Sequence, residues 1–117
     1  MNINNPQINE NLEFLERRIN FYTQGIKGYL DIKEYYNKSV NISINAINKV
    51  LIDIQNAKKY GTKQQLQILK NNQNWFKSQL KFDKKGMKWC NEGIKGDKLE
   101  LAFYQNSLKK LIKETLV

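Results

Sequence analysis

The sequence of 117 residues contains no histidine, one cysteine and one proline. Without imidazole the chain cannot build His-based acid/base catalysis, a Ser-His or Cys-His nucleophile, or an ordinary zinc site. The lone cysteine, Cys90, cannot form an internal disulfide and fits a reducing compartment. Carboxylates are few and scattered. We therefore expect no enzyme activity, no metal and no cofactor.

Long apolar runs are also missing from the sequence. No segment approaches the roughly 18 apolar residues that a membrane-spanning helix needs, and residues 1–7 lack the basic and apolar regions of a signal peptide. The sequence therefore predicts a cytoplasmic protein.

Hydrophobic residues make up 40% of the chain and charged residues 26%, which is typical of a folded protein. The scarcity of proline and glycine favours long helices. We expect one all-α domain covering residues 1–117, built as an antiparallel bundle of about four helices. These are predicted at residues 6–36, 40–60, 63–82 and 97–115, with a short helical piece near 87–94.

Local signals support most of these helix ends. Asn5 before Pro6 is a good N-cap, Gly61 suits a helix C-terminus, and Thr62 followed by Gln65 is a capping box. Asp97 begins a second capping box. Residues 40–45 alternate apolar and polar side chains like a strand, but the longer window has helical spacing, and we favour a helix there.

The tetrapeptide Gly-Ile-Lys-Gly occurs twice, at 25–28 and 93–96. Aligning residues 14–40 with 82–108 gives seven identities in 27 positions, which predicts two related helical halves. Each glycine costs about 1 kcal/mol inside a helix relative to alanine. Either the first helix breaks at the first copy, or another part of the chain approaches its backbone closely. The four candidate hinge glycines are Gly25, Gly28, Gly93 and Gly96.

A Gly-x-x-Gly segment with a lysine inside resembles the loop with which KH domains grip nucleic-acid phosphates. The flanking residues of both copies have helical spacing, however, and neither copy lies in an evident βααβ unit. A joint between helical segments is the better interpretation.

The net charge of the chain is +9. Residues 37–117 have a net charge of +10, and residues 1–36 have a net charge of −1. The chain also has eighteen Lys, sixteen Asn and thirteen Ile, so a bias toward AT-rich codons is an alternative source of the lysines. Aromatic residues alternate with lysines between residues 76 and 98, as in surfaces that bind single-stranded nucleic acid. The candidate contacts for nucleic acid or an acidic partner are Lys77, Lys81, Lys84, Lys85, Lys88, Trp89, Lys95 and Lys98.

Three functions remain open after these exclusions. The leading hypothesis is a non-enzymatic helical module that docks on another macromolecule, chiefly a protein partner or a second copy, through apolar helix faces. The alternative is an accessory factor, of the kind found in phages and mobile elements, that binds nucleic acid nonspecifically through its basic C-terminal two-thirds. Docking on an anionic membrane surface is a third hypothesis.

Overall fold

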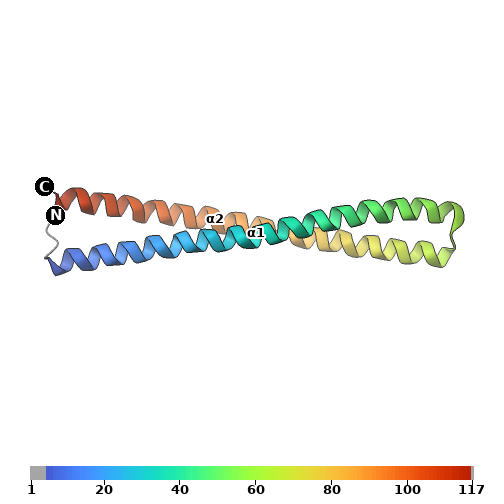
Figure 1. Cartoon of the computed structure of the whole chain (residues 1–117), viewed down its shortest axis with the longest axis horizontal. Coiled ribbons are helices and arrows are strands. Elements are labelled where there is room, and N and C mark those ends of the chain that lie inside the picture. Colours follow the sequence, from blue (N-terminus) through green and yellow to red (C-terminus); the bar gives the residue numbers. More distant parts are fainter. Residues whose placement is uncertain (1–4, 117) are drawn as a thin grey trace. The chain divides into compact units, whose positions relative to one another are not determined.

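The computed structural model describes residues 5–116. These residues form two helices: α1 spans Pro6–Tyr60 and α2 spans Lys63–Thr115, with 55 and 53 residues. In Figure 1, α1 runs from blue to green and α2 continues through yellow to red. The fold is all-α as expected, but the predicted bundle of about four helices is wrong, because the two helices are not divided further.

The chain divides into two compact units, and both helices contribute to each. Unit 1 is Met1–Asp31 with Cys90–Val117, and unit 2 is Ile32–Trp89. Unit 2 contains the connection between the helices and is a helical hairpin, whereas unit 1 pairs the first part of α1 with the last part of α2. The expectation of a single domain over residues 1–117 stays a prediction.

The predicted start of α1 is confirmed. Asn5 precedes the helix, and its side-chain Oδ1 accepts a hydrogen bond from the backbone N–H of Gln7 at 2.9 Å. Pro6 takes the first helical position, where its missing N–H leaves no backbone bond unmade. Asn5 therefore acts as the N-cap.

The connection between α1 and α2 also follows the sequence signals. The Gly61 N–H donates to the Ala57 carbonyl at 2.9 Å, which closes the last turn of α1. The Thr62 N–H then donates to Gln65 Oε1 at 2.9 Å, and the Gln65 N–H donates to Thr62 Oγ1 at 3.1 Å. These reciprocal bonds confirm the capping box, and the helical assignment of residues 40–60 is also confirmed.

Three predicted helix boundaries are wrong. α1 continues through residues 37–39, and α2 continues through residues 82–86 and through Asp97, the expected N-cap of a last helix. Each helix continues because its inward-facing residues repeat at alternating spacings of three and four without interruption, from Ile8 to Ala57 and from Leu66 to Thr115. No proline interrupts either series.

The two related helical halves at 14–40 and 82–108 are also wrong as structural units. Residues 14–40 lie wholly within α1, and residues 82–108 lie wholly within α2. Each is a stretch of one continuous helix and not a pair of helices around a joint. The shared residues reflect the common seven-residue period of the two helices.

Candidate interaction surfaces

The alternating spacing assigns every residue of the helices to one of seven positions, a to g, in the usual coiled-coil lettering. Positions a and d form the seam, which is the line of side chains facing the other helix. In α1 the d positions include Leu15, Tyr22 and Tyr29, and in α2 the a positions include Leu66 and Ile94. The remaining positions then define which surfaces of each unit are left for partners.

The seam of unit 2 contains a buried polar group. The Asp83 side chain is 1% exposed and occupies a d position of α2. Its carboxylate accepts hydrogen bonds from the Ser39 hydroxyl of α1 and, at 3.2 Å, from Gln79 Nε2. Because a buried carboxylate without donors would be costly, these two donors are what allows Asp83 to lie in the seam.

Two of the four candidate hinge glycines, Gly93 and Gly96, differ in their environments, and Gly86 resembles Gly93. A Cβ added at Gly93 would overlap the Tyr29 ring in unit 1, and one added at Gly86 would overlap the Tyr36 ring in unit 2. In contrast, a Cβ at Gly96 would meet nothing within 4 Å. Gly86 and Gly93 therefore make room for a tyrosine of the opposite helix, whereas Gly96 does not.

The first copy of the tetrapeptide behaves in the same way. A Cβ at Gly25 would overlap the Asp97 carboxylate, whereas Gly28 has open space around it. Of the two outcomes expected at these glycines, close approach by another part of the chain is found at Gly25 and Gly93, and neither pair ends a helix. A hinge at Gly25, Gly28, Gly93 and Gly96 stays a prediction.

Large apolar side chains recur every seven residues at the c positions of both helices, which face away from the seam. We call this set the aromatic stripe. It is formed by Phe14, Phe21, Tyr35 and Ile42 on α1 and by Ile68, Trp75, Phe82, Trp89 and Phe103 on α2, all of them 46–69% exposed. Gly28 and Gly96 take the same position once in each helix. In each unit the stripe side chains form a second regular apolar surface in addition to the seam.

The stripe side chains also contact the edge of the seam. The Trp75 ring lies 5.1 Å from the Phe76 ring in unit 2, and the Phe103 ring lies 5.2 Å from the Tyr104 ring in unit 1, both edge to face. These centroid distances are typical of favourable aromatic pairs. In each unit the stripe is therefore continuous with the apolar interior and not a set of isolated side chains.

Lysines occupy a different side of α2. The e and b positions of this helix hold nine lysines and no acidic residue, and we call them the lysine face: Lys63, Lys70, Lys77, Lys81, Lys84, Lys88, Lys95, Lys98 and Lys109. In unit 2 several lysines gather around one shallow hollow, which is lined by Lys77, Leu80, Lys81, Lys84, Lys85 and Lys88. The predicted lysine cluster thus forms one local surface over these five lysines.

The other predicted contacts lie elsewhere. Lys95 and Lys98 belong to unit 1, where they line a different hollow with Ile94 and Leu99. Trp89 follows Lys88 directly, so it points about 100° away around the helix and lies in the aromatic stripe. Trp89 also lies one helical turn from Lys85, so its place among the predicted contacts stays a prediction.

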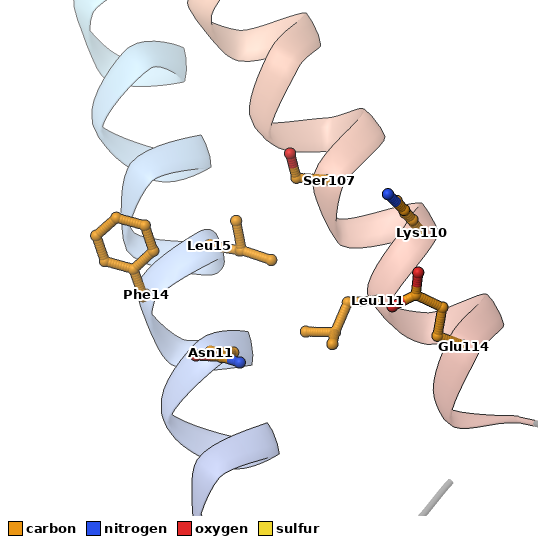
Figure 2. Close-up of a pocket in the computed structure, with 7 residues that line it drawn as sticks. All are labelled: Asn11, Phe14, Leu15, Ser107, Lys110, Leu111 and Glu114. Atoms are coloured by element: carbon orange, nitrogen blue, oxygen red, sulfur yellow. The ribbon is translucent and has the colours of Figure 1, made fainter.

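A further hollow lies in unit 1, near the ends of the two helical segments. Figure 2 shows Leu15 of α1 and Leu111 of α2 pointing toward one another, with Phe14 turned away. Lys110 and Glu114 lie at the edge on the α2 side. The hollow therefore joins a seam contact to a charged rim.

Within residues 5–116, no group of three or more Cys, Asp or Glu side chains could hold a metal ion. Over the same range, neither helix is apolar enough to cross a membrane. Comparisons with protein-family models, curated proteins and solved structures found no match for this chain.

The sequence pattern could have shown the aromatic stripe. Residues 68, 75, 82, 89 and 103 are large and apolar at multiples of seven, but the helix boundaries expected after residue 82 and before residue 97 divided them among separate elements. Following one period across the predicted breaks would have placed them all on one side of one helix.

Proposed function

We propose that this protein is a non-enzymatic helical interaction module of the cytoplasm, which docks on a protein through its aromatic stripe. The observation that carries the proposal is the regular exposure of large apolar side chains on a surface separate from the seam. Stripe residues such as Phe21 and Phe82 are 64% and 62% exposed. Surfaces of this kind mark sites of protein association.

The composition of the stripe supports this assignment. Tryptophan, tyrosine and phenylalanine are the residues that carry most binding energy in protein interfaces, and both tryptophans of the chain lie in the stripe. The seven-residue period matches the period at which a partner helix presents its own side chains.

Photo-crosslinking in the native cell tests the proposal. A benzophenone amino acid replaces Trp75 in the stripe, and in a control protein it replaces Ile52, which is also exposed but lies at an f position. We expect protein adducts from position 75 and few from position 52. Equal yields from the two positions would contradict docking through the stripe.

We propose a second function, nonspecific binding of nucleic acid, for the lysine face of unit 2 together with the adjacent Lys85. The favouring observation is the hollow lined by Lys77, Lys81, Lys84, Lys85 and Lys88, on a helix whose e and b positions carry no acid. α2 contains no arginine, the residue best suited to bidentate recognition of guanine. The binding would therefore rest on phosphate charge alone.

Filter binding of duplex DNA across a salt series tests this second function. Five phosphate contacts predict a log-log slope of about −4.5. A flat dependence on salt would exclude it. Vesicles with and without anionic lipid, measured in the same series, would show whether the lysines prefer a membrane surface.

A further inference from the structure

Unit 2 carries the longest run of the aromatic stripe. Six of its side chains lie there, and each is 55–69% exposed: Tyr35, Ile42, Ile68, Trp75, Phe82 and Trp89. Four aromatic rings and two isoleucines with this exposure amount to on the order of 800 Å², which is the area that each partner contributes to a standard protein interface. Unit 2 alone therefore exposes enough apolar area for a stable dimer.

Charge indicates what could cover this surface. Unit 2 contains twelve basic and three acidic residues, a net charge of +9. Its c and g positions, however, hold only one charge of each sign, Lys49 and Asp53. An acidic partner or a nucleic acid would be attracted to the lysine face and not to this neutral surface.

A second copy of the same unit fits a neutral surface better. Two copies that meet through their c and g positions direct their lysine faces away from the contact, so the repulsion between two strongly basic units is small. The c side chains of α1 and α2 also share one seven-residue period, with successive side chains about 10.5 Å apart along the helix. A copy related by two-fold symmetry presents the same spacing in return.

The intramolecular packing extends into this surface. The Tyr35 ring lies 5.9 Å from the Tyr36 ring, and the Trp75 ring lies 5.1 Å from the Phe76 ring. Tyr36 and Phe76 are seam residues. A second copy on the stripe would therefore enlarge the existing apolar interior of unit 2 and would not form a separate contact.

From the area, the neutral charge and this continuity, we propose that the aromatic stripe of unit 2 binds a second copy of the chain, giving a homodimer. This inference rests on the proposed function, because it names the protein that docks on the stripe. The dimer is isologous: the same six side chains contribute from both copies.

Analytical ultracentrifugation of the purified full chain measures the dimer directly. We expect a concentration-dependent dimer, and we expect Phe82→Gln and Ile42→Gln each to raise its dissociation constant about tenfold or more, because each change acts twice in a symmetric contact. Ile52→Gln is the matched control, since Ile52 is 58% exposed on the same helix as Ile42 but outside the stripe. It should change the dissociation constant less than about twofold.

Tryptophan fluorescence supplies a second measurement. Both tryptophans of the chain, Trp75 and Trp89, lie in the proposed contact. On dimerisation their emission should shift to shorter wavelength and acrylamide quenching should fall, at the same concentrations at which the sedimenting mass doubles. Circular dichroism confirms that each variant is still helical. If Phe82→Gln lowers the helicity, the measurement on Ile42→Gln decides the test.

Two results would overturn the dimer. One is a chain that sediments as a monomer up to about 100 μM, because a dimer with a dissociation constant above that concentration would be much weaker than ordinary specific protein complexes. The other is a dimer that Ile42→Gln and Ile52→Gln weaken equally. The proposed function fails separately: crosslinks from position 75 to a different protein, with a monomeric purified chain, reject the second copy and retain docking through the stripe.

Discussion

Unit 1 and unit 2 have nearly the same length and both are built from α1 and α2, but their charges differ. Unit 2 contains twelve basic and three acidic residues, whereas unit 1 contains eight of each. The whole net charge of +9 therefore belongs to unit 2. A bias toward lysine codons acting on the entire chain would not by itself leave one unit balanced. Because both units form a seam but only unit 2 is basic, the excess of lysine is not required for pairing the helices and is available for a charged partner.

The largest expected effect is on DNA binding, and it is tested by comparing two pairs of lysines. Lys84 and Lys88 lie in unit 2, and Lys95 and Lys98 lie in unit 1, and each pair has one lysine at an e position and one at a b position. We expect the double variant K84Q/K88Q to lower the log-log salt slope of DNA binding by about 1.8 and the affinity by roughly 10-fold to 30-fold at physiological salt.

The matched variant K95Q/K98Q should change the slope by less than half as much, because Glu92, Asp97 and Glu100 lie close to these two lysines in sequence. Filter binding from low to high salt measures both variants. Equal losses would mean that total charge, and not the charge of unit 2, governs binding.

The second comparison concerns two serines at g positions. In unit 2 the Ser39 hydroxyl donates to the buried Asp83 carboxylate, whereas in unit 1 the Ser107 hydroxyl donates to the Phe103 carbonyl of its own helix at 2.9 Å. Ser39→Ala should lower the free energy of unfolding by about 1–3 kcal/mol, because the carboxylate loses a donor in the seam.

Ser107→Ala should change the free energy of unfolding by less than about 0.5 kcal/mol, since the helix keeps its backbone bonds and alanine is a good helix former. Urea titrations followed by circular dichroism measure both. If Ser39→Ala proves as mild as Ser107→Ala, the hydrogen bond across the seam does not stabilise unit 2.

The sequence predicted the helix ends that have capping signals, but it also predicted breaks where polar residues lie in the seam. The capping signals at Asn5 and at Thr62–Gln65 were sufficient to place the start of α1 and the start of α2. The predicted break near residue 82 and the predicted start at Asp97 fell where aspartates occupy d positions. A hydrophobic pattern loses its phase at such residues, although the helix does not.

The candidate sites show a similar limit. The lysines at 77–88 were identified from composition and lie together around one hollow. The grouping of Trp89 with them stays a prediction, because Trp89 lies one turn from Lys85 but about 100° around the helix from Lys88. The glycine environments depend on the partner helix, as at Gly86 beside Tyr36, and a sequence without the pairing register contains no signal for that contact.

Both units contain a glycine that packs against a tyrosine of the opposite helix. Gly93 faces Tyr29 in unit 1 and Gly86 faces Tyr36 in unit 2, and an added Cβ would overlap the ring in both. Gly93→Ala and Gly86→Ala should therefore have similar effects, in which the cost of displacing a ring, about 1–3 kcal/mol, offsets or exceeds the helix-propensity gain.

Gly96→Ala is the control for this pair, because an added Cβ there meets nothing within 4 Å. It should raise the free energy of unfolding by about 1 kcal/mol through helix propensity alone. Thermal unfolding of the three variants gives the order of their stabilities. A gain at Gly86 or Gly93 as large as the gain at Gly96 would show that the tyrosines move aside without cost.

The smallest expected effect concerns Glu34, one of only three acidic residues in unit 2. Its Oε1 lies 3.4 Å from Lys38 Nζ, but both side chains are about two-thirds exposed or more. Exposed pairs at this spacing contribute about 0.3–0.5 kcal/mol, so Glu34→Gln should lower the free energy of unfolding by no more than that. The same change removes a negative charge from the basic unit and should raise DNA affinity slightly. Opposite signs for the two measurements are expected only if stability depends on the local pair while polyanion binding depends on the charge of unit 2. A fall in both would mean that Glu34 acts on the fold and not on the charge.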